Sequence, residues 1–523
     1  MNRSPHSWWR RLALAVTIAT AASLLAACSG GTTSPSTGSP GADNIDRNAS
    51  LTFGYFEPAT SMDPMLGTSS QDLPWLLPVY DTLLHTAKDG NVVSGLAKSF
   101  KLTGTAMTLT LRSGLTFQDG TKLDAAAVVA NFQRAKTLPT SSVKADLSPV
   151  TGVKAIDETT VELSLSAPDA ALPALLADRA GMMISPKAMT DGTNLATTPV
   201  GAGGWKLVNY AAGDHLDVTR FDGYWDPKSV MIKNLEIRLI ADDNTRLNAV
   251  RAGEVDIAQL SATQVALAKS DSSITVRTDT ALAVDHLGMN IAIKPFDNPK
   301  VREAINYAID RKALMQGLYR GVGEVAWQPF PDGYFANDPK LDNKFAYSPK
   351  KAKQLLTEAG YPNGFSFDFK TNNQPFRVQA TEAIAGMLKA VGITANIVPE
   401  EGPALLNAFY YEKTVPIYFT PWGGRADPSL TLDNLFGPTG LNNPSKVTAP
   451  ALTDLLTRAR ETANKDERGP ILQKASAEIM GTSRMIPLVF PGVTVGYRSN
   501  VVGYSTGITG KEQFLGVGVT KKK

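Results

Sequence analysis

One loop of this sequence combines an aromatic ring, a guanidinium group and a carboxylate. It spans residues 422–428, with the sequence Trp-Gly-Gly-Arg-Ala-Asp-Pro, and follows a β-prone run at Val415–Thr420. Ligands of open α/β sheets lie beyond the carboxyl ends of strands. Trp422 offers a flat apolar face and Arg425 a rigid fork of donors, which together suit a planar or carboxylate-bearing ligand. Asp427 is either a third ligand contact or the partner of Arg425.

A second loop meets the same rule. The β-prone run Leu51–Tyr55 continues directly into residues 56–64, where Phe56 and Glu57 are the first candidates for ligand contact. If two halves of the chain face each other, this loop and the Trp422 loop meet across one cleft. Trp327 is a further cleft candidate, although a tryptophan is more often part of a core.

The sequence contains none of the common motifs of catalysis or metal binding. A Walker phosphate loop, His-Glu-x-x-His and Gly-x-Ser-x-Gly are all absent, and the four histidines are scattered. If the single cysteine, Cys28, is acylated, no thiol ligand remains for zinc. We therefore expect no catalytic residues, metal or cofactor.

The first 27 residues are typical of a secretory signal peptide. Three arginines precede an apolar run, Leu12–Ala27, which is too short and too rich in alanine and threonine for a membrane span. The following Leu-Ala-Ala-Cys resembles a bacterial lipobox, in which Cys28 becomes the lipid-attached N-terminus. Arg10 and Arg11 leave open whether export is by the general or the twin-arginine route. Since Cys28 is the only cysteine, a disulfide within the chain is excluded.

Residues 28–48 are rich in serine, glycine, threonine and proline, so we expect a flexible tether with a reach of about 25 Å. Without the three arginines of residues 1–27, the chain keeps 49 basic and 49 acidic residues. A neutral chain gives no electrostatic basis for binding nucleic acid.

Two helices have clear start signals. Asn298 and Ser348 suit N-caps, and a proline follows each at the first helical position. In the helix that follows Asn298, the spacing of apolar residues predicts one buried face and one exposed face. The inward residues are Val301, Ile305, Ala308 and Ile309, and the outward ones are Glu303, Asn306 and Asp310.

Strand and helix patterns alternate from Phe365 to Thr420, which predicts a mostly parallel sheet covered by helices. Alternating apolar residues predict half-buried strands at Met107–Leu111 and Val161–Leu165, and Asp124 suits a helix cap between them. We expect a helix at Tyr80–Leu84.

Three longer strings resemble one protein family in the same order along the chain. They are LRSGLTFQDGTKLDAAAVVANFQRA (111–135), GAGGWKLVNYAAGDHLDVTRFDGYWD (201–226) and PFDNPKVREAINYAIDR (295–311). The family comprises the extracytoplasmic solute-binding proteins of peptide-type ABC importers, the dipeptide- and oligopeptide-binding class called bacterial solute-binding family 5. The resemblance covers residues 50–515.

The resemblance implies an α/β, periplasmic-binding-protein type II fold, with two lobes around a hinge and an extra domain in the first lobe. The implied parts are a first lobe at 49–88, 199–283 and 487–520, the extra domain at 89–198, and a second lobe at 284–486. It also implies a monomeric substrate-binding lipoprotein on the outer side of the bacterial cell membrane. Such a protein passes a peptide or peptide-like solute to an ABC permease and its ATPase subunits.

One departure from the family pattern concerns the ligand. Peptide-binding relatives commonly carry an aspartate shortly after the tryptophan, where it pairs with the amino terminus of the ligand. Here Arg425 lies near that place, and Asp427 aligns with the following Asp-Pro. This departure argues against a peptide with a free amino terminus and leaves a non-peptide solute as an alternative. Because fold alone does not define function, a sensor or chaperone on the same scaffold and a secreted hydrolase are further alternatives.

Overall fold

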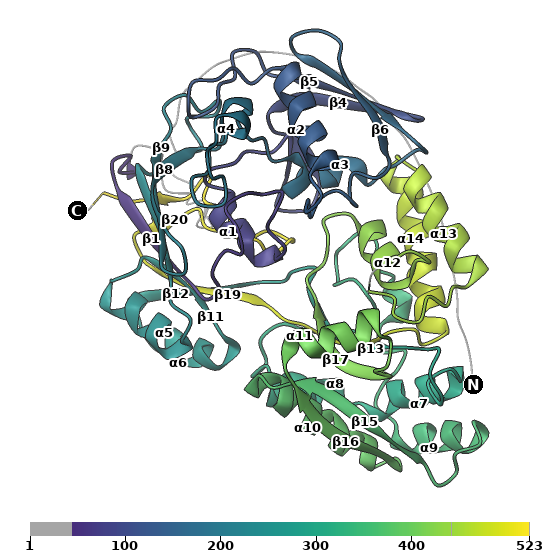
Figure 1. Cartoon of the computed structure of the whole chain (residues 1–523). Helices are drawn as coiled ribbons and strands as arrows, with labels where there is room; N and C mark the ends of the chain where they lie inside the picture. Colours follow the sequence, from purple (N-terminus) through teal and green to yellow (C-terminus); the bar gives the residue numbers. More distant parts are fainter. Residues whose placement is uncertain (1–43, 441, 522–523) are drawn as a thin grey trace, which may run out of the picture. The chain divides into compact units, whose positions relative to one another are not determined.

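The computed structural model describes residues 44–440 and 442–521 (Figure 1). The predicted signal peptide, Cys28 and the predicted tether up to residue 43 lie outside the described residues. The last part of that tether, residues 44–48, is bonded to the folded body. Ile45 forms an antiparallel β-bridge with Thr520. The Arg47 guanidinium donates hydrogen bonds to the carbonyl oxygens of Pro227 and Val230. Residues 44–48 therefore belong to the folded body and not to the tether.

A seven-stranded mixed sheet is built around the first predicted strand. Its order is β12-β19-β11-β1-β10-β9-β8, and β1 pairs in parallel with both of its neighbours. The strands are β1 (Ser50–Tyr55), β8 (Trp205–Ala211), β9 (His215–Arg220), β10 (Asn234–Leu239), β11 (Ile257–Leu260), β12 (Ile274–Asp279) and β19 (Val493–Arg498). Helices α5 (Asp243–Ala252) and α6 (Val265–Lys269) pack on it through a small apolar cluster. Helix α5 ends at Gly253, whose φ of 75° suits glycine.

A four-stranded antiparallel sheet follows in the chain, in the order β4-β5-β7-β6. The strands are β4 (Ala97–Thr103), β5 (Ala106–Leu111), β6 (Val150–Ala155) and β7 (Thr160–Leu165), and helix α2 (Ala125–Thr137) packs against them. Every second residue of β5 and β7 is buried, as the alternation predicts. Asp124 caps α2 by accepting from the amide of Ala127 at 3.0 Å.

Short elements complete this half of the chain. They are α1 (Leu73–Leu76), β2 (Leu84–Thr86), β3 (Val92–Ser94), α3 (Leu172–Leu175), α4 (Pro186–Thr190), β20 (Val501–Val502) and β21 (Gly518–Val519). The predicted helix at Tyr80–Leu84 is wrong, because the chain there enters strand β2, which pairs with β3. Its apolar residues are buried in the shared core, which a helical pattern alone does not distinguish from a buried strand.

The other half contains a second four-stranded sheet, in the order β14-β18-β13-β17, and all of its pairs are antiparallel. Its strands are β13 (Val284–Met289), β14 (Glu324–Val325), β17 (Ile417–Trp422) and β18 (Ile486–Phe490). Strands β15 (Phe365–Asn372) and β16 (Ile393–Glu400) form a separate parallel pair. The predicted parallel pairing is therefore confirmed for β15 and β16, but the prediction is wrong for β17, which pairs with β13 in the antiparallel sheet.

Helices surround these strands in three apolar clusters. They are α7 (Pro299–Ala308), α8 (Arg311–Gly317), α9 (Pro349–Glu358), α10 (Pro375–Lys389), α11 (Gly402–Leu406), α12 (Pro428–Phe436), α13 (Pro450–Glu461) and α14 (Lys465–Gly481). Within the described ranges, none of the helices has both the length and the apolar character needed to cross a membrane.

The predicted caps of α7 and α9 are confirmed. The Asn298 side chain accepts from the amide of Lys300, and the Ser348 side chain accepts from the amide of Lys351. The inward stripe of α7 is fully buried. Asn306, predicted on the outward face, is also fully buried, because its amide oxygen accepts a hydrogen bond from Arg311 at 2.7 Å.

The chain passes between the two halves twice. It leaves the seven-stranded sheet after β12 and enters the second four-stranded sheet at Val284, where β13 begins. It returns between β18 and β19, at residues 491–492. The predicted boundary at 487 would cut β18, so the change of sheet comes a few residues later than expected.

Arg311 joins four segments of the second half. Its guanidinium donates to the carbonyl oxygens of Pro487 (2.7 Å), Asn306 (3.0 Å) and Phe345 (3.4 Å) and to the side chain of Asn306. Only 1% of the residue is exposed, and burial lowers the pKa of Arg311 to about 9. The charge is dispersed over carbonyl dipoles, which fixes α7, α8 and β18 relative to one another.

Replacing Arg311 with alanine should destabilise this half of the protein by about 3 kcal/mol or more, since several buried acceptors lose their donor at about 1–3 kcal/mol each. Urea unfolding followed by circular dichroism measures the change. The neighbouring exposed Lys312→Ala is the control and should leave the midpoint within about 0.5 kcal/mol of wild type. Equal midpoints for the two variants would contradict the role of Arg311.

Candidate functional site

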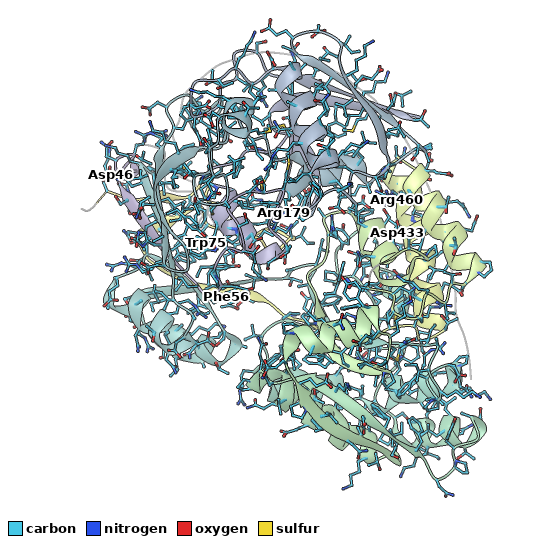
Figure 2. The ribbon with its side chains drawn as sticks, viewed as in Figure 1. Asp46, Phe56, Trp75, Arg179, Asp433 and Arg460 are labelled. Atoms are coloured by element: carbon cyan, nitrogen blue, oxygen red, sulfur yellow. The ribbon has the colours of Figure 1, made fainter. Side chains whose placement is uncertain are left out.

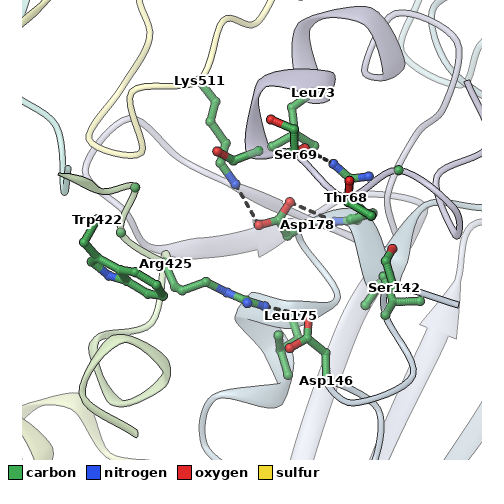
Figure 3. Close-up of a pocket in the computed structure, with 17 residues that line it drawn as sticks. Thr68, Ser69, Leu73, Ser142, Asp146, Leu175, Asp178, Trp422, Arg425 and Lys511 are labelled. Atoms are coloured by element: carbon green, nitrogen blue, oxygen red, sulfur yellow. Dashed lines mark hydrogen bonds and ion pairs between the residues drawn. The ribbon is translucent and has the colours of Figure 1, made fainter. Parts of the chain in front are cut away.

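A cavity of about 310 Å³ lies where segments from both halves of the chain meet (Figure 3). Residues 67–73, 142–146 and 175–180 line it from the first half, residues 422–425 line it from the second, and Lys511 completes it near the C-terminus. This volume lies at the lower end of the range of small-molecule pockets.

The Trp422 loop is held in one conformation. Thr431 of α12 accepts hydrogen bonds from the Trp422 indole nitrogen (3.3 Å) and from the Arg425 amide (3.2 Å). Gly424 has a φ of 65°, and a Cβ there would lie 2.4 Å from the carbonyl oxygen of Leu282, so glycine is required. The loop thus presents the indole ring and the Arg425 side chain to the cavity from a fixed backbone.

Charged groups of opposite sign face each other across the cavity. Arg425 donates to Asp146 at 2.7 Å, and Lys511 donates to Asp178 at 2.7 Å (Figure 3). Burial would raise the pKa of Asp178, but Lys511 and then Arg425 outweigh it and lower this pKa to about 2. Burial would lower the pKa of Arg425, but Asp146 and Asp178 outweigh it and raise that pKa. Both groups are therefore charged at neutral pH.

Behind the cavity wall, Asp72 organises the loop that contains residues 67–70. Its carboxylate is fully buried and accepts from the amide and hydroxyl of Thr60, both at 2.8 Å, and from Arg179 at 3.2 Å. Arg179 also donates to the carbonyl oxygen of Ser69. The charge of Arg179 is thus matched by Asp72.

Two of the six predicted ligand residues, Trp422 and Arg425, line the cavity. Phe56 and Glu57 lie outside its lining, because the chain turns back after β1 and only residues 67–73 reach the cavity. Phe56 packs on Tyr55, with 4.8 Å between ring centroids. The carbonyl oxygen of Glu57 accepts from the Trp75 indole at 3.0 Å, and burial together with Asp72 raises the pKa of the Glu57 carboxyl.

Trp327 and Asp427 also lie outside this cavity. The Arg311 guanidinium lies 5.3 Å from the Trp327 ring centroid, and Trp327 lines a separate hollow of about 190 Å³. Asp427 is buried, caps α12 through the amide of Ser429 (2.9 Å), and accepts two bonds from Arg468 at 2.5 and 2.7 Å. The predicted alternative that Arg425 pairs with Asp427 is wrong, because Asp427 is already paired.

Sequence reasoning missed Asp146, Asp178, Arg179 and Lys511 as cavity residues. No motif or periodicity distinguishes them, and each lies at least 240 residues from the Trp422 loop or in the C-terminal segment. Only the pairing of distant segments brings them to the cavity.

A second contact joins the two halves beside the cavity. Arg460 of α13 donates to Asp169 at 2.8 Å. It also donates to Asp433 at 3.0 Å, and Figure 2 labels both of these residues. The carbonyl oxygen of Arg460 also accepts from the amide of Ala170 at 2.7 Å. With the pair formed by Arg425 and Asp146, this contact connects the second half to residues 146–170 of the first.

Comparisons with known proteins give a consistent result. The family described as "Bacterial extracellular solute-binding proteins, family 5 Middle" matches residues 91–443. The glutathione-binding protein GsiB of Shigella dysenteriae serotype 1 (strain Sd197) is 31% identical over 463 residues, which covers 85% of this chain and 90% of GsiB.

Two solved structures share the fold. One is the ABC transporter-associated periplasmic binding protein DppA from Helicobacter pylori in complex with the peptide STSA, with a TM-score of 0.79 and 26% identity over 92% of this chain and 99% of DppA. The other is AgaA from A. tumefaciens R10 in complex with agropinic acid, with a TM-score of 0.78. It is 25% identical, and the match covers 91% of this chain and 99% of AgaA. The predicted α/β, periplasmic-binding-protein type II fold is confirmed.

Replacing Asp427 with alanine should destabilise the protein by about 3–5 kcal/mol, because the Arg468 guanidinium would remain buried without its partner. Thermal melting and urea unfolding measure this change. Asp454→Ala is the matched control, since Asp454 lies on the exposed side of α13 and should cost at most about 0.5 kcal/mol. A loss no larger than that of the control would contradict a structural role for Asp427.

Proposed function

Since the chain belongs to the family 5 bacterial extracellular solute-binding proteins, we propose that it captures a peptide or peptide-like solute in the cavity beside Trp422 and Arg425. Proteins of this family are extracytoplasmic binding proteins of ABC importers and not enzymes. The proposal extends this to delivery of the bound solute to the permease, which works with its ATPase subunits.

The observation that carries the proposal is the cavity itself. It combines the indole ring of Trp422 with the paired charges of Arg425 and Asp146, and it is lined from both halves of the chain. A ligand held there contacts both halves at once, so its binding energy favours their closed arrangement.

Two relatives support a peptide-like ligand. GsiB is named for glutathione, which is a tripeptide, and the H. pylori DppA structure contains the peptide STSA. The AgaA structure contains agropinic acid, which is not a peptide. Each of these ligands carries a carboxylate. A guanidinium fork at Arg425 matches that group through two parallel hydrogen bonds.

The proposal includes attachment to the membrane through Cys28. Residues 1–27 have the pattern of a signal peptide, and Leu25–Cys28 resembles a lipobox. Attachment there places the folded body, which begins at residue 44, close to the membrane-embedded permease. We further propose that the protein acts as a monomer whose two lobes close on the solute.

Arg425 provides the test of the ligand proposal. Native mass spectrometry of gently purified protein identifies bound solute, and calorimetry with that solute or with a mixture of short peptides measures affinity. Arg425→Ala should weaken binding by at least tenfold, because truncating one member of a desolvated charge pair costs about 2–5 kcal/mol. Arg425→Lys should restore it only in part, since a point charge lacks the fork.

Melting must first show that each Arg425 variant is folded. Wild-type affinity in the folded Arg425→Ala variant would remove Arg425 from the site. Failure of the wild-type protein to bind any peptide or to carry any solute would overturn the proposed function.

Attachment through Cys28 is tested separately. The wild-type protein should partition with membranes and carry a lipid on its N-terminal residue, whereas Cys28→Ala should prevent the modification and release the protein from the membrane. Mass spectrometry of the mature N-terminus and membrane fractionation measure both. An unmodified, uncleaved N-terminus in the wild-type protein would contradict the proposal.

A further inference from the structure

The ion pair between Arg425 and Asp146 lies inside the cavity and joins its two sides. The two side chains are 28% and 30% exposed, so both reach the space that a ligand would occupy. In the part of the chain that the structure describes, Arg425 is the one side chain that bonds to the carboxylate of Asp146. A ligand that enters this space must therefore compete with the pair or replace it.

The charged groups that line the cavity, taken together with Asp72 behind its wall, are balanced. Each cation has one acidic partner, and the pairs are Arg425 with Asp146, Lys511 with Asp178 and Arg179 with Asp72. A ligand end with a single charge, placed between Arg425 and Asp146, would leave one of these two groups unmatched in a partly desolvated site, which is unfavourable. A ligand end that carries one positive and one negative group preserves the balance there.

We propose that the cavity recognises the α-amino-acid end of its ligand, that is, an ammonium and a carboxylate on one carbon atom. Asp146 binds the ammonium and Arg425 binds the carboxylate, so the ligand takes the place of the direct pair. This inference rests on the proposed function and adds the ligand class to it.

Asp146 suits the ammonium better than the other lining acid does. The carboxylate of Asp178 already accepts from Lys511 and from the amide of Arg179 at 2.8 Å. Asp146 loses only one hydrogen bond when Arg425 turns to a ligand, and that bond is partly exposed. Exposed ion pairs contribute little net stability, so the exchange has a small cost.

The short distance between Arg425 and Asp146 favours a ligand whose two charges also lie close together. The oxygen of Asp146 and the nitrogen of Arg425 are 2.7 Å apart, so the two side chains meet at one point. Bond lengths place the nitrogen and a carboxylate oxygen on one carbon about 3 Å apart, whereas the ends of an extended tripeptide are about 10 Å apart. An α-amino-acid end therefore satisfies both partners after a small displacement, and the two ends of a linear peptide do not.

Two isomeric tripeptides test this inference. In γ-Glu-Cys-Gly, which is glutathione, the first residue keeps its ammonium and carboxylate on one carbon, whereas in α-linked Glu-Cys-Gly that carboxylate forms the peptide bond. Composition and net charge are the same. Calorimetry with the reduced peptides should show that the wild-type protein binds the γ-linked isomer at least tenfold more tightly.

Asp146→Asn, which keeps the shape but removes the charge, should weaken binding of the γ-linked isomer at least tenfold and reduce the preference between isomers to less than threefold. Asp454→Asn is the control for the loss of one acid and should retain the wild-type preference, because Asp454 lies on the exposed side of α13. If Asp146→Asn melts early, the isomer comparison in the wild-type protein decides alone.

Equal binding of the two isomers, or wild-type binding of the γ-linked isomer by folded Asp146→Asn, would overturn the inference. Binding of neither isomer would also overturn it. Preference for the α-linked isomer would overturn this inference while leaving the proposed function in place. The proposed function fails only if peptide mixtures and native mass spectrometry also give no bound solute.

Discussion

The antiparallel pairing of β13 with β17 is the constraint on which the site depends. Its register places Val284, the first residue of β13, opposite Trp422, the last residue of β17. The chain enters its second half at Val284, so the loop after Trp422 lies beside the point where the chain passes between its two sheets. Gly424 makes this approach close, because its backbone packs directly against Leu282. The loop is therefore held next to the first half by backbone pairing, and it lines the same cavity as residues 67–73 and 142–146.

Burial separates the charged groups into two kinds. Asp427 with Arg468 and Asp72 with Arg179 have at least one member that is almost completely buried, and their hydrogen-bonding capacity is used within the protein. Removing one partner of such a pair leaves an uncompensated charge, so these pairs maintain the shape of the loops. Arg425 and Asp146 are more exposed, and their net contribution to stability is correspondingly small. The same residue types thus hold the scaffold in one place and remain available for exchange in another.

Arg311 is a single buried cation that connects several segments of the second half through hydrogen bonds. Its donors reach carbonyl oxygens on segments more than 170 residues apart in the chain, including Asn306 and Pro487. Strand β18 belongs to the same sheet as β13 and β17. The hydrogen bond from Arg311 to β18 therefore ties helices α7 and α8 to the sheet that ends at Trp422. Position 306 was predicted to face solvent from helical periodicity alone, and it is buried because its side chain completes this network.

Local signals in the sequence determined much of the fold. The caps at Asn298, Ser348 and Asp124 depend on neighbouring residues only, and the alternating strands β5 and β7 depend on a repeat of two. Trp422 and Arg425 are predicted for a similar reason, since they come soon after the β-prone run Val415–Thr420, although the strand itself extends to Trp422. Only the tertiary structure brings Asp146, Asp178 and Lys511 to the cavity. It also determines the antiparallel pairing of the sheet β14-β18-β13-β17. Strand partners and charge pairs form between segments that lie far apart in the chain, and their free energy comes from contacts that no window of neighbouring residues contains.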